Sequence, residues 1–358
     1  YYFMMILLLA ALLMVAICFR HDRPLRRIPL RELHVREMFV ASAGLLMLMY
    51  VLCYGKVLDW LSSPRICLYV VLGPALLVFF LRTQHRSRNP YVDLAPLRQP
   101  KALVGYLYMM IVMFFSTSTT LLTNYMTSIL QVDATHSYTL YVWLLPGYAL
   151  GAFVCFWWFR WQRWRFRFLI AGGMACFALF FGLLYFGISP GSTYQSLFFP
   201  VFVRGAGMLT LIIAFALFAV EELNPKYLIC NAFFLIACRS VLAPVMAASF
   251  YGNALYRLQQ KYLCSLSEHF TLTDPAAAAK YAAALDSSLA RGHGYAEAAQ
   301  LATGELYSTL QQQSLLLALK DILGWLFAVS LLLAVVSRFI PFHKTIRVRY
   351  AKAGDDMV

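Results

Sequence analysis

The sequence predicts an all-α polytopic membrane protein, and two observations carry this prediction. Hydrophobic residues make up 61% of the 358 residues and charged residues only 13%, whereas soluble proteins carry about 25% charged residues. Apolar runs of about the 20 residues that a helix needs to cross a bilayer recur nine times. Barrel strands use about 10 alternating residues, so we expect helices. The runs are 3–19, 38–55, 66–81, 102–123, 139–159, 168–188, 197–220, 227–250 and 314–337.

The first three runs are expected to form one separate helix and a pair. A cleaved signal peptide carries its positive charge before the apolar stretch, but here the first arginine, Arg20, follows the run 3–19. This run is therefore expected to remain as a helix. The runs 38–55 and 66–81 are joined by a short loop, which predicts antiparallel neighbours.

The remaining six runs are expected to form a bundle, interrupted by the polar segment 251–313. Within that segment, Asp274 is the expected N-cap, and Pro275 occupies the first position of a helix that ends near Gly292, as capping preferences favour. A second helix, about 296–313, is expected to continue into the last span. The whole segment is predicted to lie outside the membrane.

Basic residues predict the orientation of the chain. If the nine helices alternate in direction, the segments on one side hold 21 Lys and Arg residues and those on the other side hold 6. Because Lys and Arg accumulate on the cytoplasmic side, we expect Tyr1 outside and Val358 in the cytoplasm. This asymmetry accounts for the net charge of +14, so nucleic acid is not an expected partner.

Charges inside the apolar runs are the first candidates for function, because such charges are costly and usually face a cavity or a partner. Arg239 lies midway along 227–250 and is the deepest charge. It is interpreted as a charge that faces a water-filled path or pairs with an acid elsewhere in the protein, or as a structural charge that forms an ion pair or hydrogen bonds to helix carbonyls. Arg204, about two turns inside 197–220, either lines the pathway or extends toward the outer interface.

Other polar residues offer two readings each. Ser116, Thr120 and Asn124 belong to a polar stretch of the run 102–123 and its end, which either lines a water-filled path or bonds helix to helix. Tyr125 offers aromatic surface to an amphipathic substrate or serves as an anchor. Glu221 and Glu222 form a gating pair with a basic loop, or a solvated turn.

No enzyme is predicted. The sequence has no Ser/His/Asp arrangement, phosphate loop or metal-ligand spacing, so no catalytic residue, cofactor or metal ligand is assigned. No pair of the eight cysteines has redox or metal spacing. They are interpreted as small apolar fillers in helix packing.

Several short motifs, in order, resemble one family of transporters. The loop 55–66 with Asp59-Trp60 is similar to the loop between two extra helices of the fourteen-span drug:proton antiporters, a branch of the major facilitator superfamily. Further similar stretches are 88–94, 125–131 followed by 144–147, 204–207 and 238–240. The long outer loop before the last helix also fits. The chain departs from the family pattern at Leu209 and around Arg239, where the family favours glycines and this chain has Leu242, Ala243 and Met246.

The resemblance implies a major facilitator fold whose first five helices are missing from this chain. It divides the chain into the last helix of an N-terminal bundle with its linker (1–37), the extra helix pair with a basic linker (38–100), the C-terminal six-helix bundle (101–340) and a cytoplasmic tail (341–358). Asp321 matches a family position and is the candidate for proton coupling. Its other interpretation is a helix-end charge beside Lys320.

The implied function is secondary active transport. Small amphipathic drugs or toxic organic compounds would leave the cytoplasm across a bacterial inner membrane in exchange for protons, by alternating access. The implied partners are membrane lipid, the substrate and protons, and exporters of this type can work with a periplasmic adaptor and an outer-membrane channel. The alternatives are a truncated or nontransporting membrane scaffold and, less favoured, a membrane-embedded transferase.

Overall fold

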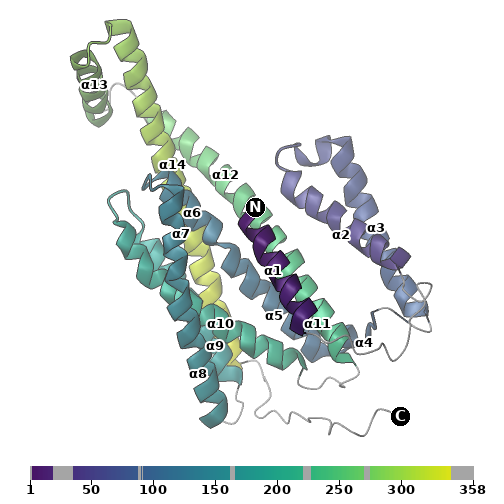
Figure 1. The fold of residues 1–358 in the computed structure, drawn as a ribbon. Helices are drawn as coiled ribbons and strands as arrows, with labels where there is room; N and C mark the ends of the chain where they lie inside the picture. The colour runs from purple at the N-terminus through teal and green to yellow at the C-terminus, as the bar shows by residue number, and fades with distance from the viewer. Residues whose placement is uncertain are drawn as a thin grey trace, which may run out of the picture.

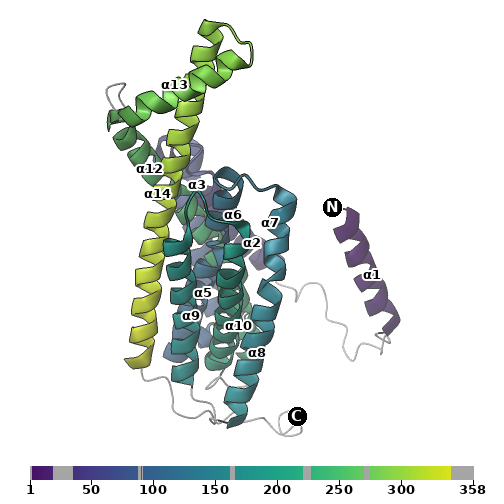
Figure 2. The same ribbon diagram turned by 90° about the vertical axis from the view of Figure 1, so that its left-hand side faces the viewer.

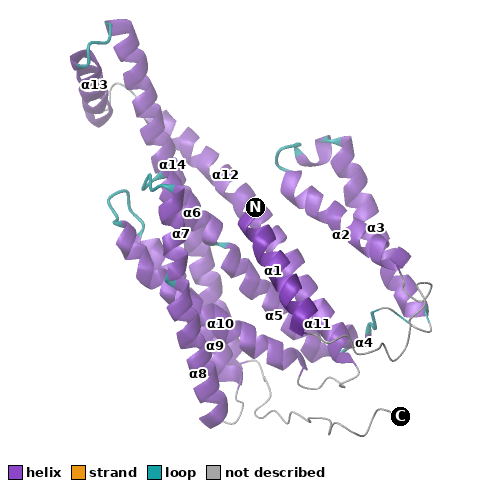
Figure 3. Ribbon diagram, viewed as in Figure 1, coloured by secondary structure: helices purple, strands orange, loops and turns teal. Residues whose placement is uncertain are grey.

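Apolar helices dominate the molecule. The computed structural model describes residues 2–18, 35–87, 90, 92–161, 166–220, 227–269 and 275–339, and none of these forms a strand (Figure 3). Among them, eight helices are long and apolar enough to cross a membrane. Large apolar side chains such as Phe186 and Ile229 are exposed on these helices, as expected of a surface that contacts lipid rather than water. The chain is therefore a multi-pass helical membrane protein.

The first predicted span is the apolar helix α1 (Tyr2–Cys18), which has 17 residues and stands apart from the other helices in Figure 2. It is shorter than the eight helices that are long enough to cross a membrane, so the other eight predicted spans are the ones that the structure supports. The predicted pair is confirmed as α2 (Val35–Tyr54) and α3 (Pro64–Arg86), connected through a short 3-10 turn, Trp60–Ser62. These two helices approach closely where Gly44 meets Gly73: a Cβ on Gly44 would lie 3.1 Å from the Gly73 carbonyl oxygen. Such small residues permit close helix packing in membranes.

A buried glutamine fixes the end of this pair to the following linker. The Gln84 side-chain amide donates to Glu37 on α2, and its oxygen accepts a hydrogen bond from the Val92 backbone N–H at 3.1 Å. Gln84 is almost completely buried. The short helix α4 (Ala95–Arg98) then leads into the bundle.

The bundle is built around α10, which contacts α5, α8 and α9, while α9 also packs along α14 (Figures 1 and 2). Its core is aromatic, with Phe177, Phe181 and Phe215 fully buried. The helices are α5 (Pro100–Thr117), α6 (Thr119–Ser128), α7 (Ala134–Val142), α8 (Leu144–Trp161), α9 (Phe166–Gly187), α10 (Phe198–Val220) after the 3-10 turn Tyr194–Leu197, α11 (Leu228–Ile236), a π-helix (Ala237–Leu242), α12 (Ala243–His269), α13 (Pro275–Ala290) and α14 (Tyr295–Phe339).

Two predicted runs are divided where the prediction had one helix. The run 102–123 breaks at Ser118, whose backbone N–H and hydroxyl both donate to the Phe115 carbonyl. This bonding competes with the regular helix. The run 139–159 breaks at Trp143 between α7 and α8, where Pro146 has no N–H to donate to the carbonyl of Val142.

The helix of the run 227–250 extends beyond the predicted end of the span. Helix α12 continues to His269, because Tyr251, Leu255 and Leu258 keep an apolar stripe at helical spacing that packs into the core beside α14. The two further helices of the segment are confirmed. Helix α13 ends before Gly292, whose φ of 88° is a left-handed conformation that suits glycine. Helix α14 runs unbroken for 45 residues from this tip into the last span (Figure 1). Asp274 lies outside the described residues.

Candidate functional site

The position of Arg204 is set by close packing of α10 against its neighbours. A Cβ on Gly205 would lie 2.7 Å from the Leu144 carbonyl oxygen of α8, and one on Gly207 would lie 3.0 Å from the Gly173 carbonyl oxygen of α9. Only glycine allows backbones to approach this closely. Helix α10 is therefore held between α8 and α9, and Arg204, immediately before Gly205, is directed into the bundle.

Arg204 is a buried cation with few partners. It is 4% exposed, which corrects the alternative that its side chain extends toward the interface. Its Nη2 donates to the carbonyl oxygen of Ser116 at 2.7 Å and is 3.3 Å from the Ser116 hydroxyl. Its Nε and Nη1 have no hydrogen-bond partner among the described residues. The guanidinium carbon lies 5.7 Å from the ring centre of Phe180, within the range of a cation–π contact.

Two hydroxyl groups beside this arginine share one weak acceptor. The Ser116 hydroxyl and the Tyr148 hydroxyl each donate to the Met208 sulfur at 3.3 Å. A thioether sulfur accepts hydrogen bonds only weakly. The cluster formed by Arg204, Ser116, Tyr148 and Met208, which we call the donor cluster, is therefore rich in donors and poor in acceptors.

The surroundings of the donor cluster are aromatic rather than acidic. The ionisable groups within electrostatic range of Arg204 are Tyr148, Tyr141 and Tyr251. The Tyr251 hydroxyl already has a hydrogen-bond acceptor, because it donates to the Phe114 carbonyl oxygen at 2.9 Å. No carboxylate is among these groups, so the buried positive charge is not balanced by a nearby acid in the part of the chain that the structure describes.

Arg239 is a second arginine near Tyr148. It belongs to the π-helix Ala237–Leu242, which forms where Pro244 cannot donate to the carbonyl of Ser240. Tyr148 lies within electrostatic range of both Arg204 and Arg239. The Arg239 side chain is exposed and makes no hydrogen bond or ion pair within the described ranges. Nearby, the Tyr106 hydroxyl donates to the buried Asn231 side chain and fixes α11 against α5.

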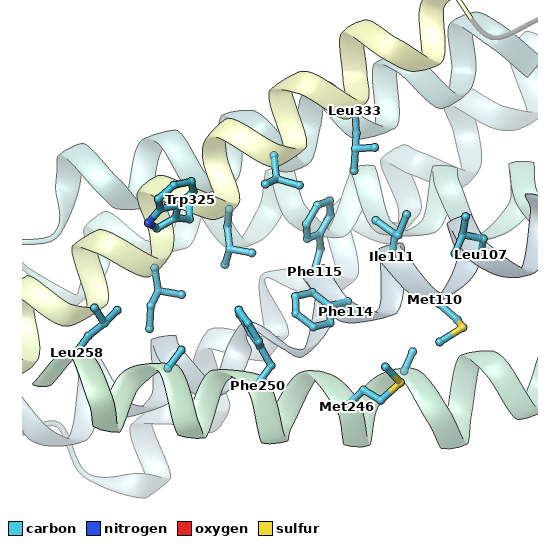
Figure 4. A pocket seen from close by; sticks show the side chains of 15 residues that line it. Leu107, Met110, Ile111, Phe114, Phe115, Met246, Phe250, Leu258, Trp325 and Leu333 are labelled. Carbon is cyan, nitrogen blue, oxygen red and sulfur yellow. The ribbon is translucent and has the colours of Figure 1, made fainter. Parts of the chain in front are cut away.

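An apolar groove lies beside this region, between α5, α12 and α14 (Figure 4). Its volume is about 720 Å³. None of the four residues of the donor cluster lines it. The Phe114 ring on its wall packs 5.4 Å from the ring of Phe250 and 5.0 Å from the ring of Tyr251. The lining residues are Leu107, Met110, Ile111, Phe114, Phe115, Ala243, Met246, Phe250, Ala254, Leu258, Ile322, Trp325, Leu326, Val329 and Leu333.

The other predicted polar residues lie away from Arg204 or turn to their own helix. The Thr120 hydroxyl donates to the Thr117 carbonyl at 3.1 Å. Tyr125 is fully buried and donates to the Ser189 carbonyl at 2.7 Å. Asn124 lines a separate pocket of about 410 Å³ with glutamines of α12 and α14, including Gln259 and Gln311. Ser116 is thus the member of this set that joins Arg204.

The predicted acidic residues are not part of the donor cluster. Asp321 on α14 accepts a hydrogen bond from the Tyr262 hydroxyl on α12, which ties these two long helices together. Glu221 and Glu222 lie outside the described residues. Met208 and the groove were not predicted as parts of the site. Met208 follows Arg204 by four residues and so shares its helix face, and the groove residues Leu107, Ile111 and Phe114 repeat at helical spacing.

Comparison with known protein families finds none that matches the chain, and comparison with curated protein sequences finds no significant match.

Proposed function

We propose that the protein is a secondary transporter of the major facilitator type, from the fourteen-span branch, that exports small amphipathic organic compounds in exchange for protons. The spans from α5 to α14 would form one of the two bundles that move against each other in alternating access. The excess of basic residues at the end of the bundle opposite α13 orients that end toward the cytoplasm of a bacterial cell.

The observation that carries the proposal is the exposed charge of Arg239 in the middle of a span. Arg239 is 11 residues from Leu228, or about 17 Å along the helix, which is near the middle of a hydrocarbon core about 30 Å thick. A cation at that depth is costly in lipid, and it has no partner within the described residues that would offset the cost. It is therefore expected to face a water-containing path.

The neighbouring features suit an amphipathic cargo. Tyr148 offers an aromatic surface with a polar group near two arginines, and the groove of α5, α12 and α14 offers apolar surface. Binding sites for such compounds combine apolar walls with a few polar groups. For proton coupling, Asp321 remains the candidate, with Tyr262 as its hydrogen-bond partner.

Efflux of fluorescent dyes from energised cells tests the proposal. Cells that express the protein should accumulate less dye than control cells that carry an empty vector. This difference should vanish when the proton gradient is collapsed. Arg239→Gln should abolish efflux, because it removes the positive charge that is proposed to face the water-containing path. Arg257→Gln on α12 removes an exposed arginine beyond the predicted span and should leave efflux unchanged.

Two results would contradict the proposal. Dye levels that do not change over a broad panel of cationic, neutral and acidic dyes, with the protein present in the membrane, would exclude drug export. Efflux by Arg239→Gln equal to that of the wild type would exclude Arg239 from the path.

A further inference from the structure

We propose that the donor cluster binds the carboxylate of a small organic acid, so that the transported compounds are acids. This inference rests on the proposed transport function for its biological meaning, but the binding site itself is argued from the contacts of Arg204. The donor cluster is distinct from the apolar groove, because none of its four residues lines the groove.

The donor cluster contains several hydrogen-bond donors that lack a strong acceptor. Two nitrogens of Arg204 have no partner among the described residues, and the hydroxyls of Ser116 and Tyr148 both donate to a sulfur. Buried polar groups are nearly always hydrogen-bonded, and leaving a donor unpaired costs free energy. The missing complement is a group with several lone pairs.

The second step is charge. A water molecule supplies lone pairs but no charge, and a buried cation is strongly favoured by a counter-charge. The ionisable groups in electrostatic range of Arg204 are tyrosines. The complement is therefore an anion. One buried guanidinium balances the charge of one carboxylate. A doubly charged phosphate would lose more hydration free energy on burial than its attraction to this single cation would offset.

The third step is geometry. A carboxylate has two oxygens with about four acceptor positions, which match the free nitrogens of Arg204 together with the Ser116 and Tyr148 hydroxyls. The Tyr148 side chain is half-buried and lies near both buried Arg204 and exposed Arg239. Rotation of Tyr148 away from the Met208 sulfur would free its hydroxyl, and the nearby charge of Arg239 would attract anions to the donor cluster. Tyr148 and Ser116 would then donate to the carboxylate instead of to sulfur.

The test compares three probes that share one apolar part. 4-Phenylbutyrate, 4-phenylbutanol and 4-phenylbutylamine are added to the purified full chain in neutral detergent, and the binding of each is measured by its shift of the melting temperature and by calorimetry. We expect saturable binding of the acid and little response to the alcohol or amine. Tyr148→Phe and Ser116→Ala should each weaken acid binding about tenfold, because each removes a hydrogen bond to a charged group.

Variants and controls separate binding from folding. Arg204→Gln should abolish acid binding, but it also alters a buried site, so Tyr148→Phe and Ser116→Ala carry the test if it fails to fold. The matched control is Ser330→Ala. Ser330 is also a serine in a membrane helix, fully buried, and its hydroxyl donates only to the Phe327 carbonyl at 2.9 Å. This variant should bind the acid like the wild type.

Three outcomes would overturn the inference: equal binding of the alcohol, unchanged acid binding in both hydroxyl variants, or equal stabilisation by inorganic phosphate or sulfate. The proposed transport function fails separately. If the acid binds as expected but no dye is exported, the carboxylate site stands without the transporter. If cationic or neutral dyes are exported while the acid does not bind, the transporter stands without the carboxylate site.

Discussion

Gly147→Ala is expected to separate α8 from α10 and to disturb the site at the same time. A Cβ on Gly147 would lie 2.3 Å from the carbonyl oxygen of Phe202 and 3.0 Å from the Cα of Gly205. These atoms belong to the backbone, so no side chain can rotate out of the way. Restoring an ordinary contact of about 3.4 Å to the oxygen requires a local separation of about 1 Å, which close-packed interiors resist.

The magnitude follows from two opposing effects. Overpacking of this kind costs about 1–3 kcal/mol, and the better helix propensity of alanine returns up to about 1 kcal/mol. We expect a net loss of about 1 kcal/mol or more in the free energy of unfolding. Because Gly205 directly follows Arg204, the same displacement should also weaken carboxylate binding.

The assay is unfolding in mixed micelles with increasing dodecyl sulfate, followed by circular dichroism. The matched control is Gly172→Ala on α9, where a Cβ would meet no atom within 4 Å. That variant should be as stable as the wild type or up to about 1 kcal/mol more stable. If Gly147→Ala unfolds at the same denaturant fraction as Gly172→Ala, the packing argument for the position of Arg204 is refuted.

Three further perturbations test other contacts. Pro244→Ala supplies the N–H that the π-helix lacks, so regular α-helix should replace it and the exposed side chain of Arg239 should rotate; efflux should fall while the free energy of unfolding stays within about 1 kcal/mol. Gln84→Leu removes two hydrogen bonds at a buried position and should cost about 1–3 kcal/mol, seen as faster hydrogen exchange at Val92. A double-mutant cycle between Tyr262→Phe and Asp321→Ala should give a coupling of about 1 kcal/mol, since this bond is partly exposed.

Each of these three has a result that would contradict it. For Pro244→Ala, retained efflux together with a regular helix would show that the π-helix is not needed. For Gln84→Leu, hydrogen exchange at Val92 equal to that of the wild type would contradict the prediction. Gln99→Leu is the control, at a half-buried helix cap whose side chain makes no capping hydrogen bond. For the cycle, strictly additive effects would mean that the Tyr262–Asp321 bond does not hold α12 to α14.

The helices were predictable from the sequence because lipid demands long apolar runs. Helices α9 and α10 begin and end within about three residues of the predicted runs, and the continuation of the outer helix into α14 was also predicted. What composition could not show was local backbone bonding. The break at Ser118 depends on a hydroxyl bond to Phe115, and the extension of α12 to His269 depends on the packing of Tyr251 and Leu255.

The donor cluster was only partly predictable. Arg204 and Ser116 were predictable candidates because each is polar within an apolar run. Their contact was not predictable, because 88 residues separate them and it depends on how α5 packs against α10. Met208 and Tyr251 look like ordinary apolar and aromatic residues of membrane helices. Their part in the site becomes visible only when the acceptors around Arg204 are counted.

The unbroken length of α14 has a mechanical consequence. Its 45 residues extend about 68 Å, more than twice the hydrocarbon thickness, so one rigid rod joins the membrane interior to the tip that carries α13. Residues 295–313 project about 28 Å beyond the span, and a 10° tilt of the rod would carry its end sideways by about 5 Å. A molecule that bound α13 could therefore restrict the movement of α14 within the bilayer without contacting any residue there.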